Sequence, residues 1–181
     1  MTHLPGRRSA LLLGLGGVLT GCGFRPVYAP SGPGGGLAAE GGAAGDLAAV
    51  EVLPMYERPG QLLREALLAR LRSEPGKPRR YELTAGFGIT GEAVGILNLT
   101  QATRARLVGT VAWTLTARDS AKTRLTEGSE RIVDGIDIFG AQLFGVDLDF
   151  EAAQRRMAML LADKVVLALA VWFARHPSAA G

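Results

Sequence analysis

The sequence predicts an α+β fold, a two-layer sandwich with two helices on one face of a mostly antiparallel four-stranded sheet. Two observations carry this prediction. Apolar residues recur with helical spacing in Leu62–Arg72 and in the long segment from Asp149 to about Arg175. Between them, Tyr81–Thr90 and Arg104–Arg118 alternate apolar and polar residues, as strands covered on one face do. The expected order of elements is β-α-β-β-β-α.

The first half of the fold is expected to be one strand followed by one helix. Ala49–Pro54 has the composition of a strand that ends at its proline. In the helix, Leu63, Leu67 and Leu71 repeat at every fourth position and form one apolar face. Pro75-Gly76 is expected to end the helix.

Three strands are expected to follow this helix. In Tyr81–Thr90 and Arg104–Arg118 every second residue is apolar, which predicts one buried face for each strand. The tight turn Asp119–Lys122 then leads into a weaker fourth strand, Thr123–Val133.

The last part of the chain is expected to be a loop and one long helix. Asp134–Asp149 is rich in glycine and isolated apolar residues, which predicts a loop, and Asp149 can cap the helix. Val165–Ala174 is wholly apolar but too short to span a membrane, and Asp163-Lys164 interrupts its extension. The helix is therefore expected to lie on the sheet. Its buried side is expected to hold Leu160, Leu161, Ala168 and Trp172, next to Phe87 and Trp113.

The N-terminus has the three parts of a secretory signal. Basic Arg7-Arg8 precedes the apolar run Ala10–Val18, and Leu19-Thr20-Gly21-Cys22 closes it. These four residues resemble a bacterial lipobox, which implies cleavage before Cys22 and acylation of that cysteine. An ordinary secretory signal or a short membrane anchor is the alternative. The expected organisation is a signal peptide at 1–21, a lipid-anchored Gly/Ala/Pro tether at 22–46, one α+β domain at 47–177 and a disordered tail at 178–181.

Charge and side-chain content argue against several classes of function. The formal charge of +3 falls to +1 once Arg7 and Arg8 leave with the signal, so no nucleic-acid partner is expected. His3 and His176 are the two histidines, and they cannot form a metal site. Glu127 and Glu130 would point to opposite faces of a strand rather than act as a catalytic pair. We expect no enzyme activity and no cofactor.

The residues at the expected mature N-terminus resemble a known family. Cys22-Gly23-Phe24-Arg25-Pro26-Val27-Tyr28 looks like the mature start of the lipopolysaccharide-assembly lipoprotein LptE family, and the order of elements is similar. The resemblance implies an outer-membrane lipoprotein, facing the periplasm, that sits inside the β-barrel translocon LptD and helps it deliver lipopolysaccharide. An auxiliary lipoprotein of another envelope transport system is the alternative.

Two groups of residues are candidate contact sites. Phe139 and Phe144 are bulky for the expected loop at 135–148 and are candidates for the partner interface, unless the loop folds onto its own core. Lys77, Arg79 and Arg80 form the densest basic group and are candidates for binding lipopolysaccharide phosphates, unless they belong to a solvated turn.

Overall fold

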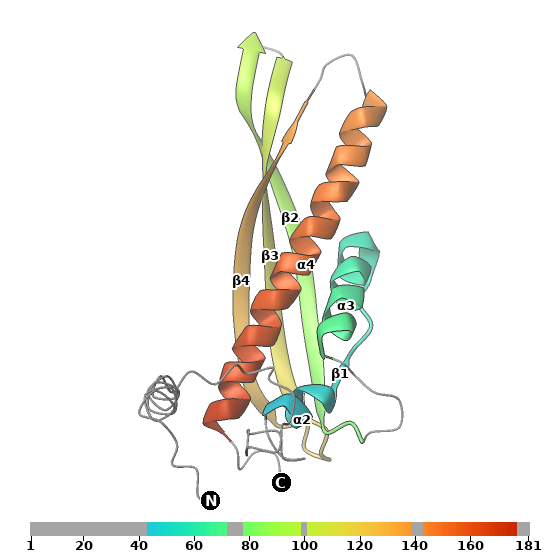
Figure 1. The fold of residues 1–181 in the computed structure, drawn as a ribbon, viewed down its shortest axis with the longest axis vertical. Coiled ribbons are helices and arrows are strands. Elements are labelled where there is room, and N and C mark those ends of the chain that lie inside the picture. The colour runs from blue at the N-terminus through green and yellow to red at the C-terminus, as the bar shows by residue number, and fades with distance from the viewer. Residues whose placement is uncertain (1–42, 72–77, 99–100, 139–142, 177–181) are drawn as a thin grey trace, which may run out of the picture.

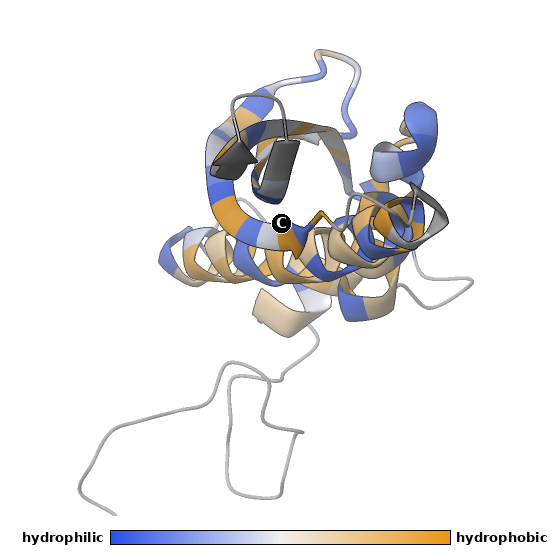
Figure 2. Ribbon diagram, turned by 90° about the horizontal axis from the view of Figure 1, so that it is seen from above, coloured by the Kyte–Doolittle hydropathy of each residue, from blue (hydrophilic) through white to orange (hydrophobic). Residues whose placement is uncertain are grey.

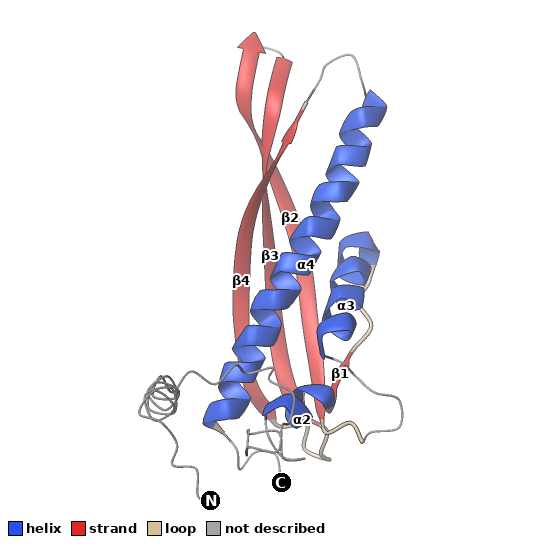
Figure 3. Cartoon of the chain, in the orientation of Figure 1, coloured by secondary structure: helices blue, strands red, loops and turns tan. Residues whose placement is uncertain are grey.

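The computed structural model describes residues 43–71, 78–98, 101–138 and 143–176. The elements, in chain order, are α2 (Ala43–Ala48), β1 (Val50–Val52), α3 (Glu57–Leu71), β2 (Tyr81–Asn98), β3 (Gln101–Ala117), β4 (Arg124–Asp137) and α4 (Leu143–Arg175). Figure 3 shows α4 crossing in front of the sheet, with α3 beside it. The predicted α+β class and four-stranded sheet are confirmed, with α2 as an additional short helix.

The sheet has the strand order β1-β2-β3-β4. Short β1 is parallel to the start of β2, with Val50 opposite Tyr81, and the other two pairs are antiparallel. This arrangement confirms the mostly antiparallel sheet. Because β2 continues to Asn98, eight residues past the expected end at Thr90, the β2–β3 hairpin extends beyond both long helices (Figure 1).

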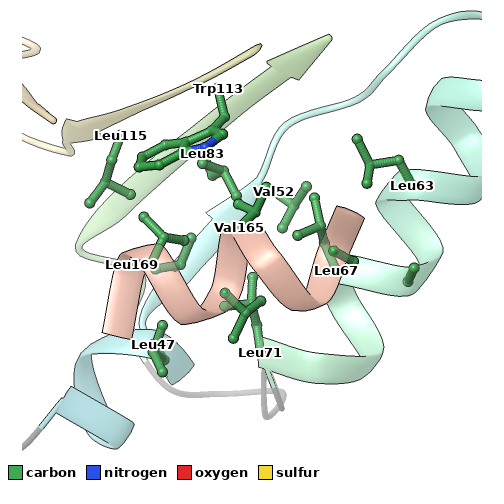
Figure 4. Close-up of a cluster of buried hydrophobic side chains, with 14 of the residues drawn as sticks. Leu47, Val52, Leu63, Leu67, Leu71, Leu83, Trp113, Leu115, Val165 and Leu169 are labelled. Atoms are coloured by element: carbon green, nitrogen blue, oxygen red, sulfur yellow. The ribbon is translucent and has the colours of Figure 1, made fainter. Parts of the chain in front are cut away.

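The core lies between the sheet and the helices α3 and α4. Along the strands, apolar and polar residues alternate (Figure 2), so one face of each strand can be buried. In Figure 4, Trp113 and Leu115 lie above Val165 and Leu169 of α4, Leu63 and Leu67 of α3 lie to the right, and Leu71 lies below. Val165 and Leu169 are fully buried.

The expected loop between the last strand and the last helix is largely absent. β4 continues to Asp137 and α4 already begins at Leu143. Ile136 is buried in β4, and Val146 packs against the same apolar cluster from α4. The prediction of a loop at 134–149 was wrong because Leu143, Val146 and Phe150 already follow helical spacing, which the intervening glycine and aspartates obscured. Asp149 therefore lies inside α4 rather than at its N-cap.

Two further expectations differ from the structure. Helix α2 includes Ala43–Asp46, which were expected to belong to the tether, and Asp46 is only 1% exposed. On α4, Leu161 is buried as expected, but Leu160 is 54% exposed because it lies on the opposite side of the helix from the sheet.

By length and hydropathy alone, Gly145–Arg175 could cross a membrane, and half of its most apolar part is buried in the fold.

Gly128 should be sensitive to the smallest substitution. A Cβ at Gly128 would lie 2.6 Å from Cζ2 of the buried Trp113, whereas a Cβ at Gly86 would meet no atom within 4 Å. We expect Gly128→Ala to lower the free energy of unfolding by about 1–3 kcal/mol through overpacking. Gly86→Ala is the matched control and should leave stability unchanged or slightly higher. Urea denaturation of the non-acylated Cys22→Ser chain measures both, and equal effects would contradict the packing described.

Candidate functional site

The sheet face turned away from α3 and α4, called the open face here, is the most extended candidate contact surface. The strand registers set three rows across it: Thr84, Thr114, Glu127; then Gly86, Ala112, Ser129; then Gly88, Thr110, Arg131. Most of these side chains are small, and only Glu127 and Arg131 among them are charged. Such a surface can approach a partner closely over a wide area.

A shallow depression lies in the middle of the open face. Its volume is about 420 Å³, and its lining includes Thr84, Gly86, Ala112, Thr114 and Glu127. The hydroxyls of Thr84 and Thr114 and the carboxylate of Glu127 belong to this lining, so a partner that covers the depression can form hydrogen bonds there.

Ion pairs lie at both ends of the open face. At the end near β1, Arg118 pairs with Glu51, and the Nζ atom of Lys122 lies 2.5 Å from Oε2 of Glu82. Toward the hairpin, Arg106 and Glu92 form another pair. Exposed pairs of this kind contribute little to stability.

Arg131 is exposed, and the described residues provide no acidic partner for it, so its guanidinium can bind an external anion.

Arg79 and Arg80, two members of the predicted basic group, both contact α2. The Nη1 atom of Arg79 donates a hydrogen bond to the Ala48 carbonyl at 2.8 Å. Arg80 forms an ion pair with the buried carboxylate of Asp46, and its guanidinium lies 5.4 Å from the centre of the Tyr81 ring. Both arginines therefore help to hold α2 against the start of β2, and neither is a wholly solvated turn residue.

Burial dominates the electrostatics of Asp46. Loss of hydration raises the pKa of Asp46, and its attraction to Arg80 offsets only part of that rise. Burial likewise raises the pKa of Tyr81, and the nearby Asp46 charge adds to the rise. The cluster is a structural link between α2 and the sheet, with Arg80 keeping the buried carboxylate paired.

The other predicted site residues cannot be compared with the structure. Cys22, Lys77 and Phe139 lie outside the described residues. Phe144 lies in the first turn of α4, and its side chain is not described. Within the described ranges, no group of three His, Cys, Asp or Glu residues is arranged to hold a metal ion.

Helix α4 provides a second candidate surface on the helix side of the molecule. Its exposed large apolar residues are Leu148, Met159, Leu160, Leu167 and Val171. A protein that stays alone in water seldom gathers so many on one element, so this side of α4 can also contact a partner or lipid.

Comparison with protein families identifies the family of this chain. The family model for LptE, described as lipopolysaccharide-assembly, matches residues 47–169, which include most of the described fold. The chain belongs to the LptE family. It is therefore a lipopolysaccharide-assembly lipoprotein associated with the cell envelope, and this family is not enzymatic.

Solved structures have the same fold as this LptE-family chain. A candidate lipoprotein from Caulobacter crescentus CB15 is 26% identical, with a TM-score of 0.60, over 74% of this chain and 96% of that one. The rare lipoprotein B from Shewanella oneidensis is 11% identical, with a TM-score of 0.52, over 67% and 92%, and shows the shared fold alone. A search of curated proteins found no match.

The open face of this LptE-family protein was not identified from the sequence, although a signal for it was present. Thr84, Gly86, Gly88 and Thr90 alternate with the buried positions of β2, so every outward residue of that stretch is small and uncharged. The alternation predicted which face was buried, but the small size of the outward residues was the clue to a contact surface.

The raised pKa of Asp46 predicts the sign of a pH effect. The folded chain binds this proton more tightly than the unfolded chain, so the contribution of Asp46 to stability is full below its ordinary pKa of 3.8 and is lost as pH rises through the folded pKa. The advantage of wild type over Asp46→Asn should therefore shrink as pH rises from 3.8 toward neutrality. Free energies of unfolding measured across that range test this. An advantage that grows with pH would mean that attraction to Arg80 outweighs burial.

Proposed function

We propose that this LptE-family protein is anchored to the outer membrane by lipid on Cys22, faces the periplasm, and associates with the β-barrel protein LptD to assist lipopolysaccharide delivery. Family membership supports the role in lipopolysaccharide assembly. The lipobox at Leu19–Cys22 supports the anchor, and two or more acyl chains suffice for stable attachment.

The observation that carries the barrel association is the open face. The lumen of an outer-membrane barrel is polar, and its outside is apolar. A face of threonine, glycine, serine and paired charges fits a polar lumen better than it fits lipid. Its small side chains also permit close approach to an inner barrel wall. Phe139 and Phe144 remain proposed contacts of the same partner.

The test is co-purification from detergent-solubilised membranes. We expect a tagged wild-type chain, without residues 1–21 and carrying added acyl mass, to retain one barrel protein in a one-to-one complex. Cys22→Ala should lose the acyl mass and the membrane fraction, because the chain has a single cysteine. Phe144→Ala in the anchored chain should weaken barrel recovery without changing thermal stability. A lipidated wild-type chain that retains a different envelope transporter, or no barrel, would contradict the proposal.

Lys77, Arg79 and Arg80 are proposed to contact lipopolysaccharide phosphates. Because Arg80 pairs with a buried carboxylate, its removal would destabilise the fold, so the variant to test is Lys77→Ala/Arg79→Ala. Thermal melting should show that this variant stays folded without the hydrogen bond from Arg79 to the Ala48 carbonyl. We expect this variant to bind purified lipopolysaccharide several-fold more weakly at low salt and to show a smaller salt dependence than wild type. Arg124→Ala removes an exposed arginine that is paired with Glu127 and serves as the control. Unchanged binding by the folded double variant would rule out this group.

A further inference from the structure

In the described part of the chain, strand β2 has a long edge with no strand paired to it, and α3 lies on the same side of β2 (Figure 1). β1 pairs only with Tyr81–Leu83, and the last bond along that edge runs from the Leu53 N–H to the Leu83 carbonyl at 3.0 Å. Pro54 then prevents β1 from continuing, because proline has no N–H to donate. Within the described residues, no strand lies beside β2 on this side after Leu83.

The direction of the free backbone groups follows from two hydrogen bonds. The Arg80 carbonyl accepts a bond from the β3 side at 2.8 Å, whereas the Leu83 carbonyl accepts one from the β1 side. Successive residues of a strand direct their N–H and C=O groups alternately to one side and to the other. The β2–β3 register is regular as far as Ala93, so this alternation continues along β2. Ala85, Phe87 and Ile89 therefore direct both N–H and C=O to the free edge. Among the described residues, none provides a partner for these groups.

The β2 edge lacks the features that normally prevent strand addition. Residues 84–91 contain no charge and no proline, and the register shifts begin only after Ala93. The outer strand at the other side of the sheet is different. β4 carries the charged residues Arg124, Glu127, Glu130, Arg131, Asp134 and Asp137. Strand addition is therefore favoured at β2 over β4.

The side chains beside this edge define what an added strand would contain. On the inner side, Phe87 and Ile89 are half-buried and present apolar surface. On the open face, a Cβ at Gly86 or Gly88 would meet no atom within 4 Å. An added strand would need apolar residues on its inner side and would have free space on its outer side.

We propose that the β2 edge at Ala85–Ile89 pairs with an extended, uncharged segment of the barrel partner, by strand addition. This inference rests on the proposed function. The strands of a closed barrel are already paired, so the segment belongs to a part of that partner outside the barrel wall.

A second copy of this chain fits less well. Antiparallel self-pairing centred on Phe87 would set Gly91 of the second copy opposite Leu83, where β1 already lies.

A matched pair of proline variants tests the edge in the lipidated complex. Ala85→Pro removes one N–H that points to the free edge of β2. Val133→Pro removes one from the outer edge of β4, since Ile138 donates toward β3 and Val133 therefore points away, and Val133 lies outside the three rows proposed to contact the barrel. We expect Ala85→Pro to lower recovery of the barrel protein about tenfold, through a lost hydrogen bond and a steric block. Val133→Pro should match wild type, with thermal melting confirming both folds.

Residue-resolved amide exchange on the wild-type chain provides a second readout that does not depend on a variant folding. In the isolated chain, the amides of Ala85, Phe87 and Ile89 should exchange rapidly, and in the barrel complex they should be protected. A barrel complex in which these amides stay unprotected would overturn the edge pairing and leave the proposed function standing. Absence of any barrel complex would overturn both. Protection in the purified chain together with a doubled mass would assign the edge to a second copy instead.

Discussion

The packing of α4 against the inner face of the sheet is the interaction on which the rest of the structure depends. Leu161, Val165 and Leu169 of this 33-residue helix are fully buried, and they cover the apolar side of strands that could not be stable alone. Because α3 and α4 lie on one side, the opposite face is left open, and because β1 is short, most of the β2 edge is left open too. The open face follows from this one-sided cover, and the unpaired β2 edge follows from the short β1.

The link between α2 and β2 determines where the chain enters the fold. Arg80 holds the buried carboxylate of Asp46, and Arg79 holds the last carbonyl of α2. Figure 1 shows α2 at the same end as the C-terminus of α4, with the tip of the β2–β3 hairpin at the opposite end. The described part of the chain therefore enters the fold at the end opposite the tip of the β2–β3 hairpin.

The sequence predicted the parts of the fold that have a clear period. The alternation in Tyr81–Thr90 and the leucine spacing in α3 identified strand, helix and buried face, because both depend on local geometry. The start of α4 was missed because Gly145 and Asp147 interrupt its apolar pattern. The role of Arg80 could not be predicted, since its partner Asp46 is distant in sequence and lies in a glycine- and alanine-rich stretch. The open face required a different clue, the small size of the outward residues.

Depletion of this protein in its own cells, followed by measurement of newly made lipopolysaccharide at the cell surface, tests the central claim most directly. If the chain assists a barrel translocon, pulse-labelled lipopolysaccharide should fail to reach the surface and should accumulate in inner-membrane fractions. The wild-type chain should restore delivery, and the Cys22→Ala chain should restore it poorly. Normal arrival of lipopolysaccharide at the surface after depletion would contradict a role in its assembly.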